Sequence, residues 1–266
     1  MKYIYFSILS VAIIYILIVI YVFINQRNLL YHPTENKYLE DQVEFEYEEV
    51  MIKTRKNIEL KSWLIKKDFD KYKTLIFFHG NAGNLFNRVH KLNKLNKLDI
   101  NILIISWRGF SGNAGKPTEK NLYYDAKESI KWLNDLGIKN EKIILYGESL
   151  GTGVAVELGQ ENTFNSIILE SPFTSIAKAA KIYYPYLPIN LLLKDRYDSI
   201  DKIINITKPI LIMHGMKDNI VPHSMGVEIF EKANEPKYSF FPKDDDHMMN
   251  FDNRLIDKIK FFININ

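Results

Sequence analysis

The sequence predicts an α/β domain with a mostly parallel central sheet flanked by helices, preceded by an N-terminal membrane helix. Two observations support this: short apolar runs alternate with helical stretches after residue 48, and residues 3–24 contain no charged side chain. Of the 266 residues 47% are hydrophobic and 25% charged, which is typical of a globular chain. The net charge of +3, with no basic block, argues against a nucleic-acid partner. The lack of cysteine excludes disulfides, Cys-based zinc sites and a thiol nucleophile.

The first predicted element is a membrane helix over residues 3–24. At 1.5 Å per residue it would extend about 33 Å, enough to cross a bilayer core. A buried core helix and a cleaved signal peptide are the alternatives. The apolar run is longer than a usual signal-peptide core, and Val22-Phe23-Ile24-Asn25 is not a small-residue cleavage site. We therefore predict that residues 1–25 form an uncleaved single-pass anchor.

The charges around this helix give a preference for its orientation. Lys2 precedes the helix and Arg27 follows it, while residues 35–49 are acidic and count little in the positive-inside rule. We expect a cytoplasmic N-terminus, with the large domain on the non-cytoplasmic face. Residues 26–47 are interpreted as a juxtamembrane connector and residues 48–266 as the domain.

The domain starts with a predicted hairpin, because residues 49–54 and 58–66 alternate apolar and polar side chains around Lys56-Asn57. Short apolar runs then predict strands buried on both faces of a parallel sheet. They cover residues 74–79, 101–106, 142–146, 166–170 and 209–214, followed by a run at 238–241. Helices are predicted between them and at the end of the chain, over residues 84–98, 119–136, 149–160, 224–233 and 253–265.

The strongest chemical signal is Gly147-Glu148-Ser149-Leu150-Gly151, which follows one of these strands and precedes a helix. A nucleophile elbow needs this context, since the serine must stand on a sharp turn whose neighbours two residues away are small. The turn also directs a helix N-terminus at the reacting oxygen. Ser149 is therefore the predicted nucleophile, against the alternative of a chance motif in a loop.

A second signal is the Gly-rich turn His79-Gly80-Asn81-Ala82-Gly83-Asn84 after the strand at 74–79. Acyl transfer needs two N–H donors for the oxyanion. Leu150 would supply one, and Asn81 or Ala82 the other. The alternative of a phosphate-binding loop is disfavoured, because the Gly-Lys-Ser/Thr of a P-loop is missing.

In this arrangement an acid and then a histidine must follow the serine along the chain. Asp218 comes just after the strand at 209–214, and His223 and His247 lie later, in predicted loops. His247 is favoured because it has its own strand-to-helix crossover. A turn aspartate and a surface histidine are the structural alternatives.

Five segments together resemble the α/β-hydrolase superfamily, in particular its membrane-anchored serine hydrolases. The resemblance implies Ser149 as nucleophile, Asp218 as acid, His247 as base, and an oxyanion hole at Asn81 and Leu150. It implies no metal and no organic cofactor. The segments are residues 79–84, Trp107-Arg108-Gly109-Phe110-Ser111-Gly112, residues 147–151, Glu170-Ser171-Pro172-Phe173 and His214-Gly215-Met216-Lys217-Asp218.

The sequence departs from the family before the histidine, where relatives usually carry glycine and this chain has Asp244-Asp245-Asp246. Nearby carboxylates favour the imidazolium, so we expect them to raise the pKa of His247 and shift the optimum of activity upward in pH.

Residues 172–208 are rich in apolar and aromatic side chains and predict a small cap over the site, unless they pack onto the sheet instead. Tyr183, Tyr184 and Tyr186 are its predicted substrate-binding residues. The sequence thus predicts a membrane-anchored serine hydrolase that cleaves carboxylic esters or thioesters, with a small-molecule ester, lipid or acylated substrate. A serine peptidase of the aminopeptidase type and a non-catalytic membrane-tethered binding protein are the alternatives.

Overall fold

The computed structural model describes residues 2–34 and 42–266, and its centre is an eight-stranded sheet in the order β10-β9-β8-β7-β4-β6-β3-β2. Only the β2–β3 and β3–β6 pairs are antiparallel, so the mostly parallel α/β sheet predicted from the sequence is confirmed. The strands are β2 Glu48–Thr54, β3 Ile58–Ile65, β4 Thr74–Phe78, β6 Asn101–Ile105, β7 Ile143–Glu148, β8 Ser166–Glu170, β9 Ile210–Met213 and β10 Lys237–Phe240.

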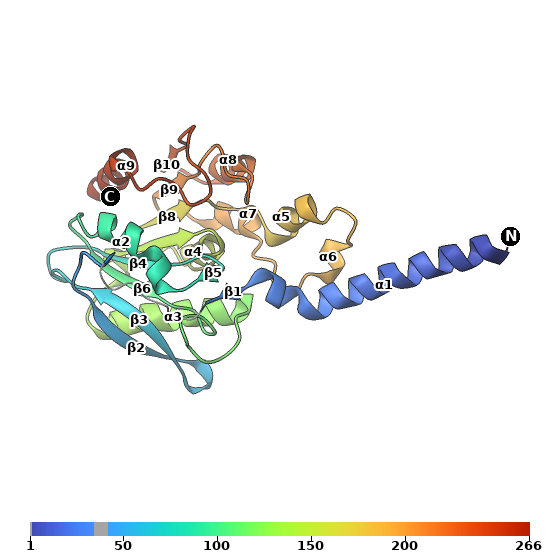
Figure 1. Ribbon diagram of the computed structural model, residues 1–266. Coiled ribbons are helices and arrows are strands. Elements are labelled where there is room, and N and C mark those ends of the chain that lie inside the picture. Colours follow the sequence, from blue (N-terminus) through green and yellow to red (C-terminus); the bar gives the residue numbers. More distant parts are fainter. Residues whose placement is uncertain (1, 35–41) are drawn as a thin grey trace.

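Helices cover both faces of the sheet (Figure 1). They are α2 Val89–Leu95, α3 Glu119–Asp135, α4 Leu150–Gly159, α8 His223–Lys232 and α9 Asn253–Ile265. Side chains of α3, α4 and α8 share one buried cluster with Ile76, and side chains of α2 and α9 share the other with Phe77. Ile76 and Phe77 are neighbours on β4, and successive side chains of a strand point to opposite faces of the sheet. Each face of the sheet therefore has its own core.

Some boundaries differ from the sequence prediction. The helix expected over residues 84–98 starts as a 3-10 turn, Leu85–Arg88, because Asn84 and Asn87 form a capping box, and α2 follows it. The region 172–208, which we call the cap, holds the short helices α5 Ile176–Tyr183, α6 Ile189–Leu192 and α7 Ser199–Lys202. Pro185 and Pro188 separate α5 from α6, as expected for residues without an N–H. Further 3-10 turns are Arg55–Asn57, Asn140–Lys142 and Ile203–Asn205.

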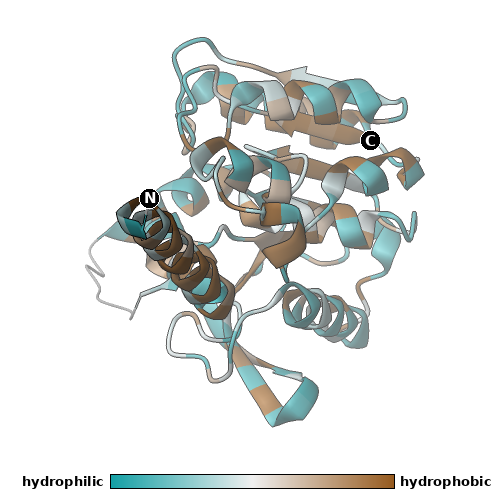
Figure 2. Cartoon of the chain, turned by 90° about the vertical axis from the view of Figure 1, so that its right-hand side faces the viewer, coloured by the Kyte–Doolittle hydropathy of each residue, from teal (hydrophilic) through white to brown (hydrophobic). Residues whose placement is uncertain are grey.

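The first helix, α1 Lys2–Leu30, extends away from the domain and is long and apolar enough to span a membrane. Figure 2 shows it hydrophobic on all sides for most of its length. It continues past residue 25, so the first part of the predicted connector 26–47 is helical. Residues 35–41 of that connector lie outside the described residues.

The end of α1 is fastened to the domain. Arg27 Nε donates to Asp195 Oδ2 at 2.8 Å, and the side-chain amide of Asn81 donates to the Leu30 carbonyl at 2.6 Å. Strand β1 His32–Pro33 then pairs in parallel with β5 Ala82–Gly83. The helix is therefore bound directly to the loop that follows β4.

Candidate active site

Ser149 stands on a sharp turn between β7 and α4, with φ 49° and ψ −115°. An added Cβ at Gly147 would lie 2.6 Å from the Gly151 carbonyl oxygen, and one at Gly151 would collide with the Phe78 carbonyl oxygen. Both positions therefore require glycine, which explains the spacing seen in the sequence. The Ser149 N–H donates to the Glu170 carbonyl at 2.8 Å and holds the turn against β8. This strained conformation exposes the hydroxyl at the end of the sheet.

The structure brings Ser149, His247 and Asp218 together. His247 Nε2 lies 3.0 Å from Ser149 Oγ, and His247 Nδ1 lies 2.6 Å from Asp218 Oδ2. Ser149 follows β7, Asp218 follows β9 and His247 follows β10, so parallel strands on the same half of the sheet, with β8 between β7 and β9, bring the three groups to one edge. An imidazole that donates through Nδ1 to a carboxylate can accept the serine proton at Nε2. The other histidine considered, His223, begins α8 and packs edge-on against Phe241.

Asp218 has more partners than the sequence indicated. Its Oδ2 also accepts from His214 Nε2 at 2.9 Å, and its Oδ1 accepts from the N–H groups of Ile220 and Val221, both at 2.8 Å. Burial raises the pKa of this carboxyl, but hydrogen bonds from His214, His247 and the Val221 N–H outweigh it and hold the pKa well below its ordinary range. Asp218 is therefore a permanent anion beside His247.

The three aspartates before His247 have other partners. Asp244 pairs with Lys217 at 2.9 Å, Asp245 accepts from the Asn250 N–H at 2.8 Å, and Asp246 accepts from the Met248 N–H at 3.0 Å. Among the described residues, Asp218 is the carboxylate that contacts the imidazole. The three aspartates are therefore bonded to groups other than the imidazole of His247.

The two residues predicted to donate backbone N–H groups to an oxyanion lie beside Ser149. Leu150 is the first residue of α4, and Asn81 lies in the loop after β4; both line the same cavity as Ser149. Neither N–H donates to another group among the described residues, so both are free for a ligand oxygen. The sequence left Asn81 or Ala82 as the second donor; Asn81 is among the residues that line the cavity at Ser149, and Ala82 is not.

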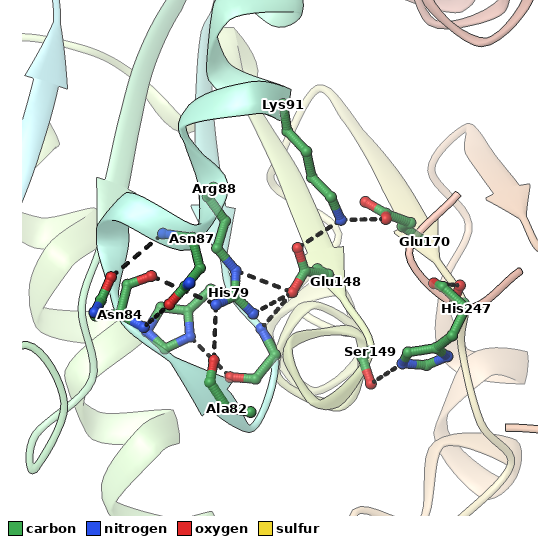
Figure 3. A network of polar contacts seen from close by, with 12 residues as sticks. His79, Ala82, Asn84, Asn87, Arg88, Lys91, Glu148, Ser149, Glu170 and His247 are labelled. Carbon is green, nitrogen blue, oxygen red and sulfur yellow. Dashed lines mark hydrogen bonds and ion pairs between the residues drawn. The ribbon is translucent and has the colours of Figure 1, made fainter. Parts of the chain in front are cut away.

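A buried network of charges lies behind the nucleophile turn (Figure 3). Glu148 accepts from Arg88 at 2.5 Å, from Lys91 at 2.7 Å and from the Gly80 N–H at 3.1 Å. Lys91 also pairs with Glu170 at 2.5 Å. The sequence analysis did not predict this network. Its signals were Glu148 inside the Gly-x-Ser-x-Gly motif, and Arg88 and Lys91 in the helix predicted over residues 84–98.

The two glutamates of this network differ in their titration. Burial raises the pKa of Glu148, but Arg88 and Lys91 outweigh it, so the net pKa lies well below the ordinary value. For Glu170, burial and the charge of Glu148 prevail over Lys91 and raise the pKa. Glu148 is therefore the glutamate that stays ionised, and it accepts the Gly80 N–H of the loop after β4.

The cavity at Ser149 has a volume of about 320 Å³ and is lined mainly by apolar side chains. Of the tyrosines predicted from the sequence, Tyr183 and Tyr184 line it. Tyr186 is not among the lining residues: its side chain is 85% exposed and its carbonyl accepts from the Tyr15 hydroxyl at 2.8 Å. The sequence also did not indicate that Val22, Leu29 and Leu30 of α1 would line the cavity. In the described part of the chain, no cluster of His, Asp or Glu has the arrangement of a metal site.

Comparisons with known proteins agree with the fold. A family model described as alpha/beta hydrolase fold matches residues 73–198. The chain is 31% identical over 223 residues to the protein Rv2307c of Mycobacterium tuberculosis, covering 83% of this chain and 79% of that one. It is 32% identical over 220 residues to bem46 of Schizosaccharomyces pombe, covering 79% and 74%. Among solved structures, the Pyrococcus furiosus esterase Pf2001 is similar with a TM-score of 0.72 and 22% identity, covering 89% of this chain and 98% of that chain.

Proposed function

The chain belongs to the α/β-hydrolase family, and from that premise we propose that it is a membrane-anchored serine hydrolase that cleaves carboxylic esters or thioesters. The main support is the hydrogen-bonded series from Ser149 Oγ through His247 to Asp218, with distances of 3.0 and 2.6 Å. Nucleophile, base and orienting acid within hydrogen-bond reach are the signature of an activated serine.

The proposed reaction starts when Ser149 Oγ attacks the carbonyl carbon of the substrate while His247 Nε2 takes the serine proton. The N–H groups of Leu150 and Asn81 donate to the oxyanion of the tetrahedral intermediate. The intermediate collapses, the bond to the alcohol or thiol breaks, and His247 returns the proton to that leaving group. Water, activated by His247, then hydrolyses the acyl-enzyme and releases the acid. Asp218 orients the imidazole and stabilises its cationic form throughout.

The proposal also covers location and substrate. Helix α1 would anchor the protein in the membrane as a single pass, with the hydrolase domain on the non-cytoplasmic face. The apolar lining of the cavity at Ser149 supports a small ester, lipid or acylated substrate. Alkaline carbonate extraction tests the anchor, because an integral helix stays with the membrane pellet whereas a peripheral one is released.

Activity is tested with the purified full-length chain and its Ser149→Ala variant. We expect hydrolysis of p-nitrophenyl esters or an acyl thioester by the wild type and a loss of at least about 10⁴-fold in kcat in the variant. A fluorophosphonate probe should label the wild type and not the variant. Ser224→Ala, on the exposed part of α8, is the matched control and should retain activity. A folded wild type that neither labels nor turns over any substrate would favour a binding protein instead.

A further inference from the structure

The cap lies alongside the part of α1 that can enter a membrane. The Tyr15 hydroxyl donates to the Tyr186 carbonyl at 2.8 Å, and the Gln26 side-chain amide donates to the Leu192 carbonyl at 2.9 Å. Helix α1 has 29 residues, which amounts to about 43 Å at 1.5 Å per residue, against a hydrocarbon core of about 30 Å. A core that begins at Lys2 would end near Val22, and Tyr15 would then lie about 10 Å inside it.

The composition of this part of the cap suits a lipid environment. Residues 182–193 contain no charged side chain and are bounded by Lys181 and Lys194. Tyr186 and Leu191 are 85% and 86% exposed. Exposed apolar side chains gathered in this way mark an interaction surface. Flanking lysines can reach the headgroups while their stems stay in apolar surroundings, and tyrosines favour the interface.

Backbone groups in this segment are largely satisfied internally, which a lipid environment requires. The Leu187 N–H donates to the Tyr184 carbonyl at 3.1 Å, the Ile189 N–H donates to the Leu187 carbonyl at 2.8 Å, and Pro185 and Pro188 have no N–H to satisfy. Burial of residues 182–193 in a leaflet would therefore cost little in lost hydrogen bonds to water.

The cavity at Ser149 lies between this segment and α1. Val22 and Leu30 contribute to its wall from α1, Tyr183 and Leu187 from the cap, and Ser149 lies in the same lining. The less exposed residues of α1 recur at helical spacing on one side, at positions 19, 22, 25, 26 and 30. The helix is thus a wall of the cavity as well as a tether.

We propose that residues 182–193 insert into the leaflet beside α1, and that the cavity between them takes the long acyl chain of a bilayer-resident lipid ester and brings its carbonyl to Ser149. This inference rests on the proposed serine hydrolase function for its chemistry, but the insertion does not depend on it. The substrate would reach the site from within the membrane rather than from water.

Insertion is tested on the full-length chain in phosphatidylcholine vesicles with and without bromine on the acyl chains. In the Leu191→Trp variant, we expect brominated lipid to quench the added tryptophan emission at least about twofold. The Phe261→Trp variant is the matched control, because its site is also exposed and lies on α9, at the end of the domain away from α1 (Figure 1). It should show no added quenching. Unquenched emission at position 191 would overturn the insertion, and this measurement needs no turnover.

The acyl site is tested in the same vesicles with a soluble butyryl ester and a palmitoyl ester dissolved in the bilayer. Val22→Trp fills part of the cavity, so the ratio of kcat/KM for the long ester to that for the short ester should fall about tenfold. Ile24→Trp changes a 67% exposed residue outside the cavity lining and should leave the ratio unchanged. An unchanged ratio in Val22→Trp would overturn the acyl site alone. The absence of turnover that depends on Ser149 would instead refute the proposed hydrolase.

Discussion

Asp218 is the most heavily bonded residue of the site. One carboxylate oxygen accepts from two imidazoles, those of His247 and His214, and the other accepts from two backbone N–H groups. Its position is fixed from four directions, so His247 is held with Nδ1 toward Asp218 and Nε2 toward Ser149. His214 bonds to Asp218 and not to Ser149 or His247 in the described part of the chain, so we expect it to act by positioning Asp218.

Replacing Asp218 with asparagine tests this orientation. The amide presents an N–H₂ where the carboxylate accepted, which favours the wrong tautomer of His247. We expect kcat to fall by about 10³–10⁴-fold, as in other serine triads, while the fold persists. Steady-state kinetics measure kcat, and far-UV circular dichroism checks that the fold persists. Asp244→Asn, at an exposed position, is the control; a fall of less than tenfold in Asp218→Asn would contradict the assigned role.

His79 offers a pH-dependent stability prediction. Its ring is fully buried, with Nδ1 donating to the Gly80 carbonyl at 2.8 Å, and burial together with the charge of Arg88 lowers its pKa from 6.5 to about 3. The neutral ring is therefore favoured in the folded state, and its contribution to stability is full above pH 6.5 and is lost as the pH falls toward 3. In thermal unfolding at several pH values, His79→Gln should show a shallower loss over this window. His32→Gln, at an exposed position, should follow the wild type. Identical slopes in all three proteins would refute the assignment.

Arg88 ends the turn before α2 and links this helix to the loop after β4. It binds the Ala82 carbonyl at 2.7 Å and Glu148 at 2.5 Å, while Glu148 binds the Gly80 N–H. The two ends of the turn that carries Asn81 are thereby held to the buried network. We expect the network to position the proposed oxyanion donor Asn81 without contacting the substrate.

Arg88→Met tests this link. The buried Glu148 loses one of its two cations, so we expect a destabilisation of about 3–5 kcal/mol and, at a temperature where the variant is folded, a fall in kcat of about tenfold with little change in KM. Arg88→Lys should restore part of the activity. Arg254→Met changes an exposed side chain of α9 and should have little effect. A loss of stability with unchanged kcat would show that the network serves the fold alone.

At the level of elements, sequence patterns predicted the helices and strands whose signals are local. Strand β8 and helix α9 have the bounds read from the sequence, because an apolar run and an amphipathic period are local signals. Ser149 was found because its turn requires glycine on both sides. The pair Lys91–Glu170 joins residues 79 positions apart, which no local pattern encodes. Strands β1 and β5, of two residues each, and the four-residue helices of the cap are too short to give a periodic signal.

For the whole molecule, the orientation in the membrane is a prediction that the lack of cysteine makes simple to test. A single cysteine at Leu136, an exposed position, would be the only thiol in the chain. We expect a membrane-impermeant maleimide to label Leu136→Cys in intact cells, as the non-cytoplasmic orientation requires. Wild-type protein is the unlabelled control. Labelling that appears only after lysis would reverse the orientation.

Under the proposed membrane anchoring, the attachment of α1 to the domain would couple the bilayer to the loop that carries Asn81. A helix longer than the hydrocarbon core adapts to hydrophobic mismatch by tilting, and the tilt changes with lipid chain length. Here the last turn of the helix is bonded to the side chain of Asn81, which also lines the cavity at Ser149. We expect turnover of a soluble short ester to change at least about twofold between vesicles of short-chain and long-chain phosphatidylcholine, and to stay constant across detergent micelles of different size. Membrane thickness would then set the catalytic rate through the mechanical strain that it places on one asparagine.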